Sequence, residues 1–143
     1  RSEENENATD NAISVIGRIL HQFPNCCGNL EQIWAIWLNY LPLREDETEA
    51  KHVHELLCNL LDSNNPYFTS ENKKQQMLPE VAKVMVQVLG TKTELASPNT
   101  CKKMARHLRE FQQIGVIDKN FLNSTVAELP KSQQSAVINA MSS

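Results

Sequence analysis

The sequence predicts an all-α fold, an α-solenoid of about three antiparallel helix pairs followed by a terminal capping helix. Apolar residues recur at steps of three and four along most of the chain, as one face of a helix requires. No run alternates apolar and polar residues, and only 4 of the 143 residues are Gly, so a sheet is not expected. Short turns join successive helical patterns. Helices joined so tightly fold back as hairpins, which helical repeat proteins stack in series.

Composition and charge narrow the class of protein. The chain is 41% hydrophobic and 22% charged, which is typical of a globular domain rather than a disordered segment. The net charge is −3, so the chain as a whole has no general attraction for nucleic acid. Residues 1–70 carry 11 acidic and 4 basic side chains, whereas residues 71–143 carry 6 and 10. We therefore expect no direct nucleic-acid partner.

Targeting signals and cysteine spacing indicate the compartment. No apolar run approaches the roughly 18 residues that a membrane span needs, and no signal peptide is recognisable. The chain begins with Arg1 rather than Met, which favours a fragment of a longer protein. Cys26, Cys27, Cys58 and Cys101 follow neither a disulfide-scaffold spacing nor a zinc spacing. A reducing compartment, the cytoplasm or the nucleus, and no membrane contact are therefore expected.

The first expected helix covers residues 9–23, with Thr9 or Asp10 as its N-cap. Gly17 interrupts it at a cost of about 1 kcal/mol relative to Ala, which close approach of a neighbouring helix would justify. Ile13 and Val15 lie outside the main stripe and add further apolar surface. The main stripe, expected to face the core, consists of Ala12, Ile16, Ile19, Leu20 and Phe23.

The second expected helix, residues 30–41, carries the densest apolar stripe of the chain. Trp34 and Trp37 both lie on that stripe, so we interpret them as core residues rather than as a ligand site. Pro42 ends the helix because proline lacks the N–H group that would continue it. The turn that follows is only a few residues long, which predicts an antiparallel neighbour.

The third expected helix covers residues 46–61. Asp46 suits its N-cap, and Glu49 stands at the capping-box position. Residues 63–75 are mostly polar and are expected to form a longer loop. Four further helices are expected over residues 77–89, 98–115, 120–129 and 132–141. In the last of them, Val137, Ile138 and Met141 are expected to dock on the preceding pair, and Lys131, Gln133, Gln134 and Asn139 to face solvent.

Two groups of residues near the second and third helices are candidates for protein binding. Glu31, Ala35 and Asn39 lie off the tryptophan stripe, on the face left for solvent. Glu45 and Glu47 could steer a basic partner, although helix capping explains the acidic group around them as well.

A third candidate group is basic. Lys102, Arg106 and Arg109 follow one another at steps of four and three, so they share a helix face. That face suits an acidic partner or a phosphate group, but an ordinary solvated outer face explains it more simply. No aromatic residues interleave with these charges as a nucleic-acid platform requires.

Metal binding and catalysis are not expected. His54 and Cys58 lie four residues apart, but a zinc site needs three or four converging ligands. There is no Gly-rich phosphate loop, nucleophile elbow or paired-carboxylate signature. The sequence therefore predicts a binding protein that needs no cofactor, rather than an enzyme.

Several stretches match a known family in order along the chain: residues 10–19 (DNAISVIGRI), 37–43 (WLNYLPL), 45–50, 57–66 and 133–138 (QQSAVI). With these stretches the chain resembles the importin-beta (karyopherin-beta) superfamily, in particular the C-terminal end of its importin-five type. The resemblance implies HEAT repeats, with residues 1–143 as one C-terminal fragment of a longer solenoid. It also implies a nuclear transport receptor that shuttles between cytoplasm and nucleus.

The partners implied by the resemblance are protein cargo, Phe-Gly nucleoporins and the GTPase Ran. The principal Ran-binding surface of the family is N-terminal, so Ran contact is expected mainly through repeats outside this chain. Cargo is usually held on the concave side, which the second helix of each pair lines. Ribosomal proteins or histones, which are basic, would suit the acidic side chains.

An alternative interpretation is a HEAT-repeat scaffold or regulatory subunit without a transport role. The matches at residues 10–19 and 37–66 are longer than generic repeat periodicity requires, which favours the receptor. A further expectation concerns the isolated chain. Removing a preceding repeat uncovers apolar surface, so the fragment is expected to self-associate through its first helix.

Overall fold

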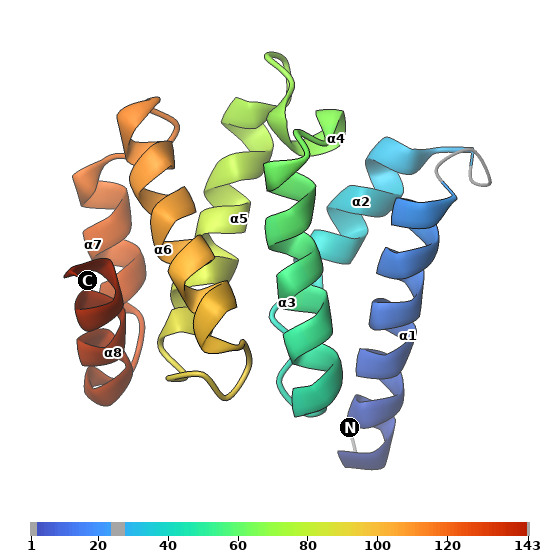
Figure 1. Ribbon diagram of the computed structural model, residues 1–143, viewed down its shortest axis with the longest axis horizontal. Coiled ribbons are helices and arrows are strands. Elements are labelled where there is room, and N and C mark those ends of the chain that lie inside the picture. Colours follow the sequence, from blue (N-terminus) through green and yellow to red (C-terminus); the bar gives the residue numbers. More distant parts are fainter. Residues whose placement is uncertain (1–2, 24–27, 143) are drawn as a thin grey trace.

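The computed structural model describes residues 3–23 and 28–142, with side chains from residue 9 onward, and within them every regular element is a helix. Figure 1 shows α1, α3 and α6 side by side, with α2 and α5 behind them. Successive long helices run in opposite directions, and the stack extends from the N-terminal to the C-terminal end of the chain. The helices are α1 (Glu3–Gln22), α2 (Leu30–Asn39), α3 (Glu47–Asp62), α4 (Pro66–Thr69), α5 (Lys74–Leu89), α6 (Pro98–Gln113), α7 (Lys119–Ala127) and α8 (Lys131–Ser142).

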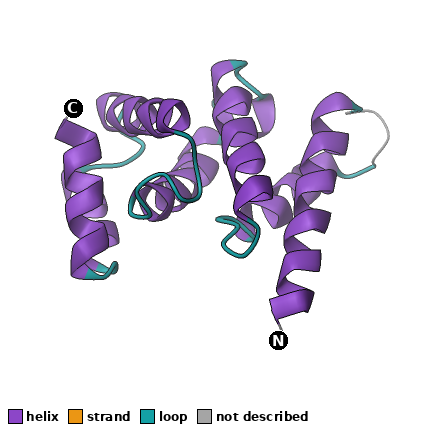
Figure 2. Ribbon diagram, turned by 60° about the horizontal axis from the view of Figure 1, so that its bottom comes forward, coloured by secondary structure: helices purple, strands orange, loops and turns teal. Residues whose placement is uncertain are grey.

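The packing confirms the predicted stack at its N-terminal end. Helix α1 packs against both α2 and α3, and α3 in turn packs against α6. The turned view in Figure 2 shows the same succession of helices joined by short loops. The third pair differs from expectation, because α7 packs mainly against α5 and α8, while α8 is the close neighbour of α6. Helix α7 is only 9 residues long and buries only Thr125 fully, so it supplies little apolar surface to α6.

The core of the N-terminal half is aromatic, as the stripe on residues 30–41 predicted. Trp34 and Trp37 are each 1% exposed, and their rings meet edge to face with centroids 5.1 Å apart. Phe68 from α4 packs on Trp34 at 5.5 Å. Such edge-on pairs place the positive ring edge against the negative ring face.

Helix α4 corrects the expected loop at residues 63–75. Asn65 caps it by accepting a hydrogen bond from the N–H of Tyr67, and Pro66 occupies the first helical position. This Asn-Pro pair is the same start signal as Ser97-Pro98 at α6, where the Ser97 hydroxyl accepts from the N–H of Thr100. The short helix forms because it buries Phe68, which a solvated loop would leave in water.

The start of α1 is a second correction. The helix begins at Glu3, so neither Thr9 nor Asp10 is its N-cap. Asp10 is buried instead, and its Oδ2 accepts hydrogen bonds from the N–H groups of Glu45 and Asp46, both at 3.0 Å. A carboxylate is well placed there, because those N–H groups precede the positive end of the α3 dipole. The residue therefore supports another helix rather than starting its own.

The face that α1 turns to the core is a third correction. Ala12, Ile16, Ile19 and Phe23, expected in the core, are exposed, as is Val15. The buried face is made of Asp10, Ile13, Ser14, Gly17 and Leu20. These positions also follow helical spacing, so periodicity alone could not choose between the two stripes. The choice follows from the polar contacts that Asp10 and Ser14 make with the α3 end of the fold.

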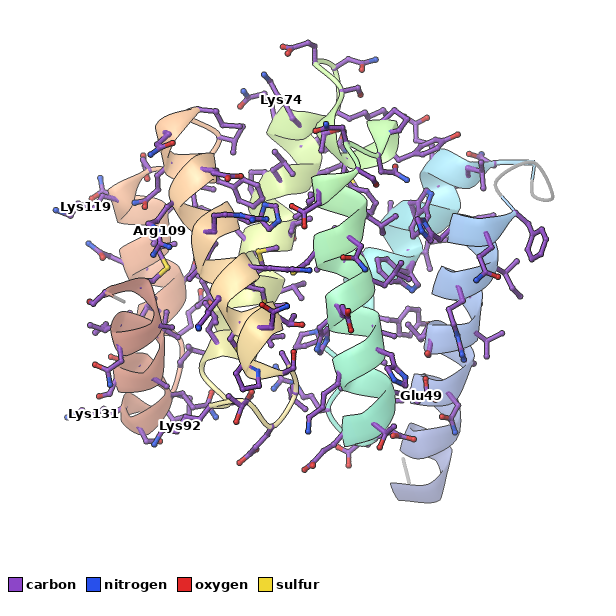
Figure 3. The ribbon with its side chains drawn as sticks, in the orientation of Figure 1. Glu49, Lys74, Lys92, Arg109, Lys119 and Lys131 are labelled. Atoms are coloured by element: carbon purple, nitrogen blue, oxygen red, sulfur yellow. The ribbon has the colours of Figure 1, made fainter. Side chains whose placement is uncertain are left out.

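The predicted cap of α3 is confirmed, although the capping box is not. The Asp46 side chain accepts from the N–H of Glu49 at 3.0 Å. The Glu49 carboxylate does not reach back to Asp46; it accepts from the Ser14 hydroxyl and lies 3.9 Å from Arg18. Figure 3 shows Glu49 on the side of α3 that faces α1. The glutamate thus joins two helices.

The terminal helix α8 docks with a face that differs in part from the predicted one. Val137 is buried and Met141 is partly buried, as expected, but Ile138 is 58% exposed. Gln133 and Gln134 were expected in solvent and are instead partly buried. The Gln134 amide binds the turn before α8, where its Nε2 donates to the carbonyl of Leu129 at 2.7 Å. A short polar turn therefore rotates the helix away from the face that apolar spacing favours.

Candidate functional site

A groove runs between α2 and α5, the second helices of the first two pairs. It has a volume of about 620 Å³. Its floor is apolar, formed by Leu38, Leu41, Met77 and Val84, which are almost fully buried. Side-chain amides of Gln32, Asn39, Gln76 and Gln87 also line it, together with Ala35, Ile36, Glu80 and Lys83.

Polar contacts connect α5 to α2 at one end of this groove and to the segment that follows α2 at the other. At one end, Lys73 before α5 forms an ion pair with Glu31 of α2. At the other end, the Arg44 Nη2 donates to Oε1 of Gln87 at 2.6 Å. Both pairs join segments that are far apart in sequence, so they fix the width of the groove rather than the shape of one helix.

The charges inside the groove compensate one another. Lys83 and Glu80 are one helical turn apart on α5 and form an ion pair at 3.5 Å. Since both are about half exposed, the pair adds little to stability. It does leave the groove without a strong field of either sign. The groove therefore offers apolar contact and neutral hydrogen-bonding groups, a combination suited to binding without chemistry.

The first group of predicted residues lies at this groove. Ala35 and Asn39 line it, and Glu31 belongs to the ion pair at its end. Glu45 and Glu47 are both exposed at the start of α3, beside the Asp46 cap. They are therefore separate from the groove residues and form a second exposed group.

The basic group on α6 is a third, separate location. Arg106 bonds Asp62 of α3 at 2.6 Å and lies 3.6 Å from Glu110. Arg109 donates from Nη1 to the carbonyl of Met141 at 3.2 Å and so supports the end of α8. Figure 3 shows Arg109 on the side of α6 towards the C-terminal helices. Lys102 is exposed. The two arginines thus hold neighbouring helices, which leaves less of their charge for a partner.

Sequence reasoning missed a second hollow, between α1 and α2. Its volume is about 650 Å³, and its lining is mostly apolar. Six of the eight large hydrophobic side chains exposed in the described part of the chain lie on or beside these helices: Val15, Ile16, Ile19, Phe23, Ile36 and Tyr40. The signal was present as the second apolar stripe of α1, but the sequence did not show which stripe was covered.

His54 and Cys58 are structural groups. His54 is fully buried, with Nδ1 2.8 Å from the carbonyl of Leu95 and Nε2 accepting from the N–H of Leu43 at 3.2 Å. This pattern requires the neutral ring with its proton on Nδ1. Burial lowers the pKa of His54 to about 4 and raises the pKa of Cys58 to about 12. Both ring nitrogens are engaged and the thiol keeps its proton, so neither residue is free to ligate a metal.

Residues 3–23 and 28–142 contain no group of three or more His, Cys, Asp or Glu side chains arranged to hold a metal ion. Within the same residues, every helix is too short or too polar to cross a membrane.

Comparison with known proteins places the chain in a family. No family model matches it. It is 31% identical over 108 residues to the probable importin-5 homolog of Dictyostelium discoideum, and this match covers 75% of the chain. It is also 25% identical over 83 residues to importin subunit beta-3 of Saccharomyces cerevisiae, covering 58% of this chain. The chain belongs to the importin-beta family. Importin-beta proteins are HEAT-repeat transport receptors, and the stacked helix pairs fit that architecture. The matches span 10% and 8% of the lengths of these two importins.

Proposed function

We propose that this chain is the C-terminal part of an importin-beta-type nuclear transport receptor and that residues 1–143 form one unit of its HEAT solenoid. It binds protein cargo reversibly and performs no chemistry. The observation that carries the proposal is the groove on the α2–α5 side, which is built from the second helices of successive pairs. The match of the chain to importins favours this role over that of a scaffold or regulatory subunit without transport function.

The partners follow from the receptor role. The exposed carboxylates of Glu45 and Glu47 suit basic cargo such as ribosomal proteins or histones. Phe-Gly nucleoporins and the GTPase Ran are further partners, with Ran bound mainly by repeats outside these residues. The receptor moves between cytoplasm and nucleus. Lys102, Arg106 and Arg109 are a secondary surface for an acidic partner, with Lys102 the least engaged of the three.

The 143-residue chain on its own also binds a second copy of itself. The apolar side chains of α1 and α2 gather on one side, and a soluble monomer rarely exposes a large contiguous apolar patch. Helix α1 already uses its other face against α3. A second copy that covers the exposed stripe removes this surface from water.

A binding assay with purified partners tests the cargo role. The chain is immobilised and exposed separately to core histones, ribosomal proteins, a Phe-Gly repeat peptide and GTP-loaded Ran. Ala35→Arg places a long charged side chain in the groove, whereas Ala127→Arg makes the same change at an exposed position of α7. Loss of cargo binding in the first variant alone is the expected result. Equal binding by wild type and Ala35→Arg overturns the assignment of cargo to this groove.

A further inference from the structure

We propose that the groove between α2 and α5 recognises an extended peptide segment of its partner through the peptide main chain, with an Asp or Glu side chain of that segment bound by Arg44. This inference rests on the proposed function, because it specifies how a protein partner occupies the same groove. It goes further in assigning the type of ligand and the groups that bind it.

The amide side chains of the groove carry the first part of the inference. A carboxamide donates and accepts hydrogen bonds, which matches the alternating N–H and C=O groups of an extended backbone. Asn39 and Gln76 line opposite helices, and among the described residues neither side chain has a hydrogen-bond partner. Amides facing a groove in this way bind a main chain without regard to the charge of its side chains.

The dimensions of the groove fit a short segment. Gln32 and Asn39 are seven residues apart on α2, roughly 10 Å along its axis, and Gln76 and Gln87 lie roughly 16 Å apart on α5. An extended peptide advances about 3.3 Å per residue, so a segment of about three to five residues spans these amides. The apolar floor of Leu38, Met77 and Val84 then faces alternate side chains of the segment.

Charge gives the segment a direction. Within the groove, Lys83 is paired with Glu80, and at one end Lys73 is paired with Glu31. Arg44 at the opposite end is different, because it donates to the neutral amide of Gln87 and, among the described residues, no carboxylate lies within ion-pair distance of it. A guanidinium has five donors, so Arg44 keeps donors that suit a carboxylate in bidentate geometry.

The first test uses a phage-displayed library of random 12-residue peptides, selected on the full 143-residue chain and counter-selected on Ala35→Arg. We expect peptides that contain Asp or Glu near one end and that bind the wild-type chain at least tenfold more tightly than Ala35→Arg. Recovery of no such peptide, or of peptides that bind both proteins equally, overturns the inference.

The second test takes the best synthetic peptide and measures its affinity by fluorescence anisotropy. Asn39→Leu and Gln76→Met keep the approximate size of each side chain and remove its amide, and each should weaken binding about threefold to tenfold. Gln75→Met and Asn59→Leu make the same changes at exposed positions outside the groove and should leave the affinity unchanged. N-methylation of the peptide bonds at the centre of the segment should weaken binding by at least tenfold. Affinity that survives N-methylation overturns main-chain recognition.

The third test isolates Arg44. Arg44→Gln should weaken the acidic peptide about tenfold and should not weaken the same peptide with Asp→Asn or Glu→Gln, so the two changes are not additive. Additive losses overturn the assignment of the carboxylate to Arg44. The tests also separate this inference from the proposed function. If histone or ribosomal-protein binding depends on Ala35 while the peptide results fail, the groove binds folded cargo by another mode; if neither depends on Ala35, the proposed function fails too.

Discussion

At the scale of single residues, Gly17 shows how one missing side chain sets the spacing of two helices. The Trp37 indole lies against Gly17, and its Nε1 donates to the carbonyl of Ile13 at 3.1 Å. A Cβ at position 17 would lie 2.6 Å from that nitrogen. The sequence indicated a close approach at this glycine, but it could not show that the approaching group is a tryptophan ring.

We predict that Gly17→Ala destabilises the protein, although alanine is the better helix former by about 1 kcal/mol. The reason is overpacking, which typically costs about 1–3 kcal/mol in a well-packed core, and here it also strains the Trp37 hydrogen bond. Thermal unfolding followed by circular dichroism should show a lower Tm for this variant. Gly28→Ala is the control, because no atom lies within 4 Å of a Cβ there. A rise in Tm for Gly17→Ala would contradict the packing argument.

His54 gives a prediction for acid stability. Its pKa is about 4 in the folded protein against 6.5 for the free side chain, because burial disfavours the charged ring. Between pH 4 and pH 6.5 the unfolded chain therefore binds more protons than the folded protein. The stability that the neutral ring contributes is fully present above pH 6.5 and is lost as the pH falls towards 4. A shift of this size corresponds to about 3 kcal/mol. His107, whose pKa burial also lowers, acts in the same direction.

Urea unfolding at a series of pH values measures this effect. The free energy of unfolding of the wild type should fall steeply below pH 6.5. His54→Gln should be less stable at pH 7 and should show a shallower decline with acid. His52→Gln removes an exposed histidine on the same helix and should retain the wild-type slope. A His54 variant with the wild-type slope would show that another group controls acid stability.

At the scale of helices, the sequence correctly indicated the starts of α3 and α6, but it was least informative about which face of a helix is buried. The caps at Asp46 and Ser97 were predictable because a capping side chain acts on its own backbone. The same local signal at Asn65 was overlooked inside a polar stretch. By contrast, α1 carries two apolar stripes, and only its contacts with α2 and α3 decide which one is buried.

The residues of the candidate site also differ in how far the sequence could predict them. Ala35 and Asn39 were predictable as groove residues because they lie off the tryptophan stripe of their own helix. Gln76 and Met77 were not, because their place in the groove depends on α5 lying beside α2. The contact between Arg106 and Asp62 joins residues 44 positions apart, so no local pattern in the sequence indicates it.

Asp10 allows a prediction about the junction of α1 and α3. Its carboxylate accepts two backbone N–H groups at the start of α3, at Glu45 and Asp46. Asp10→Ala removes the carboxylate that accepts both hydrogen bonds at a buried position, which should lower the free energy of unfolding by about 1–3 kcal/mol. Chemical denaturation measures the loss, and hydrogen exchange should locate it at residues 45–50. Asn11→Ala, at the exposed neighbouring position, is the control and should change stability little. Equal effects of the two substitutions would argue that Asp10 does not stabilise the start of α3.

At the scale of the whole molecule, the distribution of exposed apolar side chains is uneven. Most of them lie on α1 and α2, while Ile114 and Ile138 are isolated exceptions near the other end of the stack. In a solenoid, each layer buries one face against the layer before it and another against the layer after it. Helix α1 buries only the face that it turns towards α2 and α3, so its outer apolar stripe resembles an interface more than a solvated surface.

We therefore predict that the 143-residue chain self-associates through α1 and α2. Light scattering should give a mass that rises with protein concentration above that of a single chain. Ile16→Glu and Ile36→Glu place charges on the apolar face and should each weaken association about tenfold or more. The reason is that burying an unpaired carboxylate costs roughly several kcal/mol, whereas a tenfold loss of affinity requires only about 1.4 kcal/mol. Ile114→Glu and Ile138→Glu make the same change at similarly exposed positions elsewhere and should leave the association unchanged. A strict monomer at high concentration, or equal loss in all four variants, would show that this face is not an interface between copies.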